Sequence, residues 1–219
     1  RCCVLVYDGL TKRLYDGNLL PIQDLKEKNA MKGNKITLRL ISDIAAAVLL
    51  TAAIIIDGLD GVSTPITSIL GGYASIAVCT LLLWKCPVMF HICAQVFILL
   101  AMGLGSILNL YDIWPGYDRI VHFISGVIIF FIGKYIGEVW VQKGRSAQFK
   151  VSAFTGLLAA FSAAGLWEVY EFAMDCLIHT QMQGANVDSM GDIVAGVLGG
   201  IAAFGAAFII NRVQKGKNT

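Results

Sequence analysis

Six long apolar stretches dominate the chain, and each is close to the length that crosses a lipid bilayer. A hydrocarbon core about 30 Å thick needs a helix of about 20 apolar residues. The stretches cover residues 37–58, 65–84, 88–111, 119–140, 151–175 and 190–211. They are continuously apolar rather than alternating, which favours helices over the strands of a membrane barrel. We therefore predict an all-α fold, a polytopic transmembrane helix bundle of about six helices.

The boundary between the third and fourth stretches is the most sharply marked. Residues 111–118 contain Pro115-Gly116, a strong turn signal, flanked by Trp114 and Tyr117. Trp and Tyr are enriched where lipid meets water, so this segment should end one membrane crossing and begin the next.

The segment before the first apolar stretch is polar and carries two Tyr-Asp-Gly repeats, at residues 7–9 and 15–17. Asp-Gly between apolar residues favours tight turns, so a short hairpin or an interfacial segment is expected there. We divide the chain into a cytoplasmic or interfacial segment, 1–36, a six-helix membrane domain, 37–211, and a cytoplasmic tail, 212–219.

Composition supports lipid as the solvent and narrows the expected partners. The chain is 57% hydrophobic and 15% charged with a net charge of +2, and its mean hydropathy is +0.70. Soluble domains carry about 25% charged residues. No block of Lys and Arg is typical of a nucleic-acid surface, so we exclude nucleic-acid binding and expect membrane lipids as partners. The six cysteines form no Cys-x-x-Cys pair and are interpreted as structural thiols.

Positive charges are distributed unequally between the two sets of connections that six crossings create. One set, together with the polar amino-terminal segment, holds nearly all of them, including Lys85, Lys143, Arg145, Lys150, Arg212, Lys215 and Lys217. The other set holds only Arg119. Cytoplasmic loops of membrane proteins are enriched in Lys and Arg, so we predict that both termini are cytoplasmic.

Acidic residues show the opposite bias. Nine of the fifteen fall at or near the outer ends of the predicted helices, namely Asp57, Asp60, Asp112, Asp118, Glu168, Glu171, Asp175, Asp188 and Asp192. A carboxylate at mid-bilayer costs about 2.5 to 3.5 kcal/mol on insertion scales, and less near the interface. Those that are buried should therefore face one another or a wet cavity.

Two predicted helices each align polar residues with small ones on a single face. In the fourth helix this face carries Asp118, His122, Gly126, Gly133 and Gly137. In the sixth it carries Asp188, Asp192, Gly196, Gly199 and Ala203. Small residues let helix backbones approach closely, so the two faces are expected to pack together.

Acids and a histidine from three helices are the candidate site. His122, Glu168 and Asp192 offer the nitrogen and oxygen ligands that bind zinc, manganese or magnesium, and helix bundles host such carboxylate sites. Asp118 or Glu171 would act as a general base or would orient a ligand. The alternatives are solvated helix ends for Asp118, Glu171 and Asp188, interhelical hydrogen bonds for Glu168 and Asp192, and a simply packed His122.

Other charged residues receive structural interpretations. Lys134 and Glu138 have the four-residue spacing of an ion pair on one helix, and Asp43 is placed to neutralise Arg39 in the same way. His91 and His179 have no clear partner in the sequence, so we interpret them as structural or solvated.

Three segments together resemble a known family. They are Tyr117-Asp-Arg-Ile-Val-His-Phe-Ile-Ser-Gly126, Trp167-Glu-Val-Tyr-Glu-Phe172 and Gly191-Asp-Ile-Val-Ala-Gly-Val-Leu-Gly-Gly200. They resemble the YjdF type of bacterial inner-membrane proteins and, more distantly, the VanZ-like proteins, which are associated with glycopeptide-antibiotic resistance. The resemblance implies a multi-pass protein of the bacterial cytoplasmic membrane, with Asp118, His122, Glu168, Glu171 and Asp192 at the matched positions. It implies a topology rather than a reaction.

The leading hypothesis is a metal-assisted enzyme that acts on a lipid or envelope precursor from an outward-facing His/carboxylate site. One alternative is a proton- or cation-coupled transporter or channel, because acids inside membranes commonly mark such paths. The other is a structural or assembly protein whose acids only hold helices together.

Overall fold

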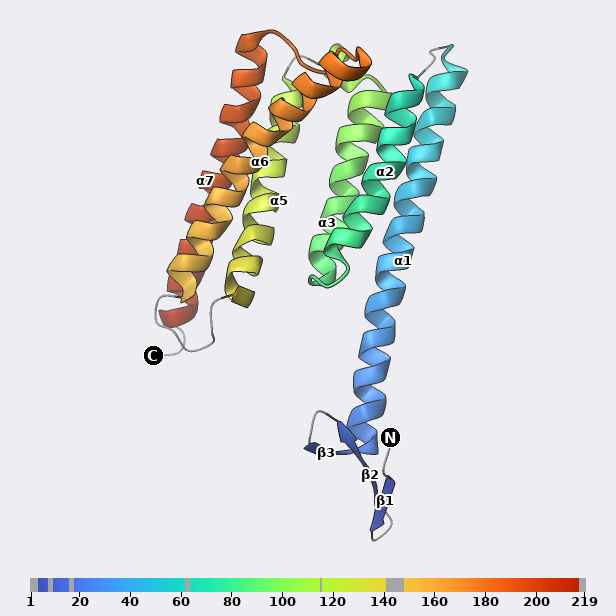
Figure 1. Cartoon of the computed structure of the whole chain (residues 1–219), viewed down its shortest axis with the longest axis vertical. Coiled ribbons are helices and arrows are strands. Elements are labelled where there is room, and N and C mark those ends of the chain that lie inside the picture. The colour runs from blue at the N-terminus through green and yellow to red at the C-terminus, as the bar shows by residue number, and fades with distance from the viewer. Residues whose placement is uncertain are drawn as a thin grey trace.

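The structure is a computed structural model that describes residues 4–7, 10–15, 18–61, 64–114, 116–140 and 148–216. It is predominantly helical (Figure 1). The helices are α1 (Ile22–Leu59), α2 (Ile66–Leu83), α3 (Val88–Ile98), η1 (Leu99–Ile107), α4 (Leu110–Ile113), α5 (Tyr117–Trp140), α6 (Gln148–Ile178) and α7 (Asn186–Gly216). The predicted helix bundle is confirmed.

Six helical segments of the described chain are long and apolar enough to cross a membrane. The first span is Gly33–Leu59, but α1 itself begins at Ile22, well before the predicted start at residue 37. The last helix likewise continues to Gly216, past the predicted end at 211. Lys, Glu and Gln are good helix formers, so these two helices continue where the sequence has already become polar.

A small antiparallel sheet precedes α1. It consists of β1 (Val4–Tyr7), β2 (Leu10–Tyr15) and β3 (Asn18–Pro21), paired in that order. The expected hairpin is therefore present. The two Asp-Gly pairs that favour its turns, residues 8–9 and 16–17, lie outside the described residues.

The third predicted helix is not one regular helix over residues 88–111. After α3 the chain widens into the π-helix η1, and Asn109 then takes a positive φ of 58° before the short α4. Gly105 has a steric role here, because a Cβ at this position would overlap the ring of Tyr111. The absence of a side chain at Gly105 thus leaves room for the Tyr111 ring to pack against η1. Pro115, which marks this boundary in the sequence, lies outside the described residues.

The spans form two groups of three (Figure 1). Helices α1, α2 and α3 with η1 pack on one another around Leu50, Ile98 and Ile107, and α5, α6 and α7 pack around Phe130. Both labelled chain ends lie at the same end of the bundle, which agrees with six crossings. We call this the terminal end. Lys143, Arg145 and Lys217 lie outside the described residues.

The predicted packing of the two small-residue faces is confirmed between α5 and α7. A Cβ on Gly126 would overlap the carbonyl oxygen of Gly196, and one on Gly199 would overlap that of Phe123. Between α5 and α6, a Cβ on Gly156 would likewise overlap the carbonyl oxygen of Phe130. These contacts bring three backbones together directly below the polar end of α5, and so fix the depth at which its acidic residues meet those of its neighbours.

Candidate metal site and a second polar network

The outer polar cluster consists of Asp118, His122, Glu168 and Asp192 at the end of the bundle opposite the chain termini. Nε2 of His122 lies 3.4 Å from Oδ1 of Asp118, one turn earlier on α5, and 4.0 Å from Oε1 of Glu168 on α6. One ligand atom each from Asp118, His122 and Asp192 of α7 lies within 4.8 Å of the others. These three residues come from α5 and α7, and Glu168 of α6 lies beside them.

Two acids of this cluster are deeply buried and lack donors. Glu168 is 6% exposed and Asp192 is 3% exposed. Both carboxylate oxygens of Glu168 and Oδ1 of Asp192 have no hydrogen-bond partner among the described residues. A buried charge without a partner costs several kcal/mol, so the cluster needs a cation or protons that the described side chains do not supply. Within the described part of the chain, these three oxygens therefore do not support the alternative interpretation of Glu168 and Asp192 as residues that form interhelical hydrogen bonds.

One side of the cluster is open. The side chain of Asp118 is 38% exposed, whereas that of His122 is 7% exposed. Nearby on the surface, Arg119 pairs with Asp188 at 3.5 Å, and its guanidinium lies over Gly191, where a Cβ would collide with it. Asp118 is therefore the member of this pair that reaches the surface.

Glu171 and Tyr111 border the cluster rather than belong to it. Nε1 of Trp167 donates to Oε1 of Glu171 at 2.7 Å, which orients this carboxylate toward its own helix. Tyr111 of α4 packs on Gly105 and contacts the ring of Tyr117 at 5.5 Å. Burial, and then the negative charge of Asp118, raise the pKa of Tyr111 above its ordinary value, so the phenol stays protonated. Sequence reasoning treated Tyr111 only as part of a turn.

The five predicted site residues therefore separate into two kinds. His122 and Asp192 come together as predicted, and Asp118 joins them in the group that offers ligand atoms. Glu168 lies at the edge of this group, 4.0 Å from His122. Glu171 is held apart by Trp167 and remains a neighbour of the group.

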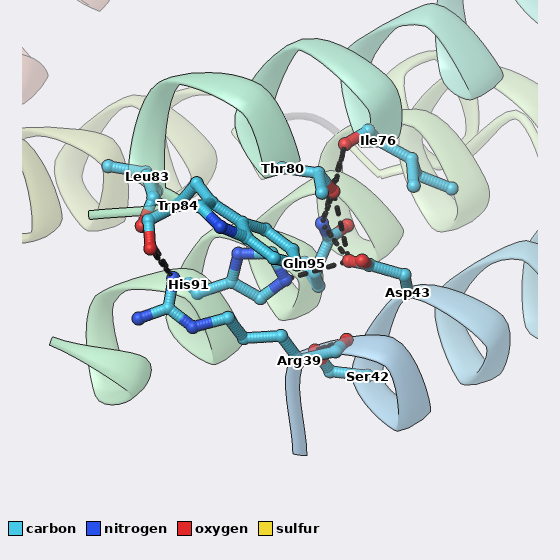
Figure 2. Close-up of polar contacts among 9 residues, drawn as sticks. All are labelled: Arg39, Ser42, Asp43, Ile76, Thr80, Leu83, Trp84, His91 and Gln95. Carbon is cyan, nitrogen blue, oxygen red and sulfur yellow. Dashed lines mark hydrogen bonds and ion pairs between the residues drawn. The ribbon is translucent and has the colours of Figure 1, made fainter. Parts of the chain in front are cut away.

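A second polar network, which we call the inner network, lies in the other group of helices, toward the terminal end (Figure 2). Oδ1 of Asp43 accepts three hydrogen bonds from two other helices. The donors are Nε2 of His91 at 2.7 Å, Nε2 of Gln95 at 2.8 Å and Oγ1 of Thr80 at 3.0 Å. His91 is 0% exposed. The sequence interpretation of His91 as having no partner is thus replaced by a specific partner from α1.

The predicted pairing of Asp43 with Arg39 is wrong. The Arg39 guanidinium instead donates to the carbonyl oxygens of Leu83, Trp84 and Cys86, and it lies over the Trp84 ring. Carbonyl groups at a helix C-terminus carry partial negative charge and lack partners within the helix, so a cation is favoured there. The predicted ion pair between Lys134 and Glu138 is present.

Comparison with known proteins places the chain in one group. Residues 38–213 match the family described as "Predicted membrane protein (DUF2238)". No curated protein and no solved structure matches the chain. The match covers every span of both helix groups, and it is consistent with the YjdF-type resemblance. The more distant resemblance to VanZ-like proteins stays a prediction.

Proposed function

Because the chain belongs to the DUF2238 family of predicted membrane proteins, we propose a function from its geometry. The outer polar cluster binds a divalent metal, zinc, manganese or magnesium, and this metal assists hydrolysis of a lipid or envelope precursor. We further propose that the chain lies in the bacterial inner membrane with both termini cytoplasmic. The cluster then opens toward the cell envelope.

The observation that carries the proposal is the pair of buried acids without donors beside a histidine. Asp118, His122 and Asp192 offer one nitrogen and two carboxylate oxygens within 4.8 Å, and Glu168 adds a fourth candidate ligand at 4.0 Å from His122. Mixed imidazole and carboxylate ligands suit zinc and manganese, and carboxylates suit magnesium. A divalent cation would compensate the negative charges that burial otherwise penalises.

Openness on one side favours catalysis over a purely structural metal. Catalytic sites leave a coordination position for water or substrate, whereas structural sites are closed by protein ligands. Asp118 is the exposed member of the cluster, so water and substrate would reach the metal past it. The metal would activate water for attack on an ester or a similar bond. Glu171, whose carboxylate lies at the edge of the cluster, would accept the proton of that water.

Dense packing below the cluster disfavours the transport alternative. On the terminal side of His122, Gly126 lies in direct backbone contact with α7, and Phe130, Ala160 and Ala203 form an apolar core. Among the described residues of α5 at that depth, the Ser125 hydroxyl donates to the carbonyl oxygen of His122 on its own helix. A conducted ion needs continuing polar groups, and this interface supplies an apolar barrier instead.

Elemental analysis of the purified full chain tests the metal site. We expect about one divalent ion per chain in wild type, and loss of this ion in His122→Ala. His179→Asn is the matched histidine control, because His179 lies away from the cluster at a positive φ of 56° that asparagine tolerates. Absence of a stoichiometric metal from wild type and from metal-supplemented protein would exclude the proposal.

A second assay separates the enzyme from the transporter. Wild type reconstituted with an extract of bacterial envelope lipids should release a water-soluble product in the presence of metal, and Glu171→Gln should abolish this release while retaining the metal. Cation flux into liposomes that is lost in Glu168→Gln, without product release, would instead favour transport.

A further inference from the structure

We propose that Arg119 binds the phosphate group of a membrane lipid, so that a phosphate-bearing lipid is the substrate class of the outer polar cluster. This inference rests on the proposed function, because it takes the cluster to be a metal site that acts on a lipid. Three observations support it. They are the place of Arg119 beside the cluster, the looseness of its ion pair, and the exposed apolar side chains that lie next to it.

Arg119 lies next to candidate metal ligands on two helices. On α5 it directly follows Asp118. Its guanidinium also lies against α7 at Gly191, the residue directly before Asp192. A Cβ on Gly191 would lie 2.9 Å from Nε and 3.2 Å from Nη2 of Arg119. The absence of a side chain at Gly191 therefore leaves room for the guanidinium beside the cluster.

The ion pair of Arg119 leaves the guanidinium able to bind another anion. The side chain of Arg119 is 53% exposed, and that of its partner Asp188 is 51% exposed. Nη2 of Arg119 and Oδ1 of Asp188 are 3.5 Å apart, whereas charge-assisted hydrogen bonds of this kind measure about 2.7 to 2.9 Å. Exposed pairs contribute little to stability, so a phosphate would replace the Asp188 carboxylate at low cost.

The distribution of charge singles out Arg119 as the anion-binding group. It is the only Lys or Arg in the connections opposite the chain termini, where nine of the fifteen acidic residues lie. These acids repel an anion, so an anionic headgroup is favoured only beside Arg119 and the proposed metal. A guanidinium presents paired N–H groups that match two phosphate oxygens, and arginine together with a divalent metal stabilises phosphoryl groups.

The neighbouring apolar side chains favour a lipid over a soluble phosphate. One turn from Arg119 toward the terminal end, Phe123 of α5 is exposed, and on α7 Val194 and Leu198 are exposed at successive turns beyond Gly191. In the membrane that we propose, these side chains contact acyl chains. Arg119 lies in the first turn of α5, at the depth expected of lipid headgroups. A lipid beside this end of α5 thus brings its phosphate to Arg119.

Lipid binding to the metal-loaded full chain in detergent tests the proposal. The probe is the dioctyl-ether phosphonate analogue of phosphatidic acid, because its ether and phosphonate bonds resist hydrolysis. Dioctylglycerol ether, which lacks the anion, is the reference ligand. By isothermal titration we expect Arg119→Gln to bind the phosphonate at least about tenfold more weakly than wild type, with unchanged binding of the reference ligand. Lys85→Gln is the matched control, because it removes an exposed cation at the terminal end, and it should bind as wild type does.

Asp188→Asn separates anion binding from a purely structural ion pair. A structural pair would lose the same function whichever partner is changed. The proposal instead predicts opposite effects, because Asp188→Asn frees the guanidinium and removes a repelling charge, and so should bind the phosphonate more tightly than wild type. Parallel weakening in Arg119→Gln and Asp188→Asn would overturn the proposal. If Arg119→Gln does not fold, Arg119→Lys keeps the charge without the paired N–H groups, and binding equal to wild type would contradict the proposal.

Elemental analysis of the same samples distinguishes this proposal from the proposed function. Equal metal content in wild type and Arg119→Gln, with phosphonate binding lost only in the variant, would support both. Equal metal content with equal phosphonate binding would overturn the substrate class and leave the metal site standing. A wild-type protein that holds no metal would overturn the proposed function, and the substrate class that rests on it would fall with it.

Discussion

Each of the two helix groups, α1–α3 and α5–α7, contains a histidine beside a carboxylate. The two groups differ in the number of hydrogen-bond donors around the carboxylate oxygens. In α1–α3, the Asp43 carboxylate oxygen has three donors around it. In α5–α7, the more deeply buried carboxylates of Glu168 and Asp192 have oxygens with no donors among the described residues. The histidine in each half faces a carboxylate, at 2.7 Å for His91 and 3.4 Å for His122.

This difference shows that burial of an acid does not by itself indicate what the acid does. A carboxylate surrounded by donors is already compensated and holds helices together. A group of carboxylates without donors requires something from outside the chain, and a divalent cation fits the spacing in the outer cluster. The comparison therefore favours a structural role for the inner network and supports the metal binding that we propose for the outer cluster.

The largest effect on stability should come from removing the Asp43 carboxylate, the acceptor of the inner network. Asp43→Ala leaves Nε2 of the buried His91 without its acceptor and removes one hydrogen bond each from Gln95 and Thr80, so we expect a loss of about 2 to 4 kcal/mol in the free energy of unfolding. Thermal unfolding in detergent measures it. The matched outer variant, Asp192→Asn in metal-free protein, should melt at or above the wild-type temperature. Equal destabilisation by the two variants would remove the distinction.

A smaller effect is expected from separating α5 and α7. Gly126→Ala places a Cβ on the Gly196 carbonyl oxygen, so the helices must move apart at a cost of about 1 to 3 kcal/mol. The outer cluster should then lose metal affinity. Gly205→Ala is the control, because a Cβ there meets open space. Unaltered metal binding in Gly126→Ala would show that the seam does not position the cluster.

Lowering the pH should weaken the binding of metal by the outer cluster. Metal ligands must be deprotonated, so we expect the metal affinity of the outer cluster to fall by about tenfold or more between pH 7 and pH 5. Isothermal titration of metal at both pH values measures this effect, and pH-independent affinity would contradict a site made of His122 and carboxylates.

The smallest effect should come from the partly exposed pair Lys134–Glu138. Ion pairs within one helix contribute about 0.5 kcal/mol or less, and the side chains of Lys134 and Glu138 are 17% and 40% exposed. Glu138→Gln should therefore leave the melting temperature and the metal content close to wild type. A large loss of stability would mean that charged pairs in this protein cannot be ranked by burial and donor supply.

Much of the fold follows from the sequence. The six spans follow from apolar length, and the α5–α7 seam follows from glycines spaced by helical turns. The helix starts at Ile22 and Asn186 were not predicted, because helix formation continues beyond the apolar residues that mark a span. The π-helix was not predicted either, because its residues are as apolar as those of a regular membrane-spanning helix.

For the sites, sequence gave unequal information. Asp118, His122 and Asp192 stand on two faces with a clear helical spacing, so their convergence could be predicted. Partners from distant helices have no such signal, so the pairing of Asp43 with His91, 48 positions later, was missed. The spacing of Asp43 from Arg39 suggested an ion pair. The Arg39 guanidinium instead donates its hydrogen bonds to carbonyl groups at the end of α2.

Metal titration of three proteins most directly tests the central claim that donor supply separates metal-binding acids from structural ones. Asp57 is a buried aspartate, 5% exposed, whose carboxylate accepts a hydrogen bond from Thr64. We predict that wild type and Asp57→Asn bind zinc or manganese with equal dissociation constants, and that Asp192→Asn binds at least about a hundredfold more weakly. Equal binding by Asp192→Asn and wild type, or loss of binding in Asp57→Asn, would contradict the account.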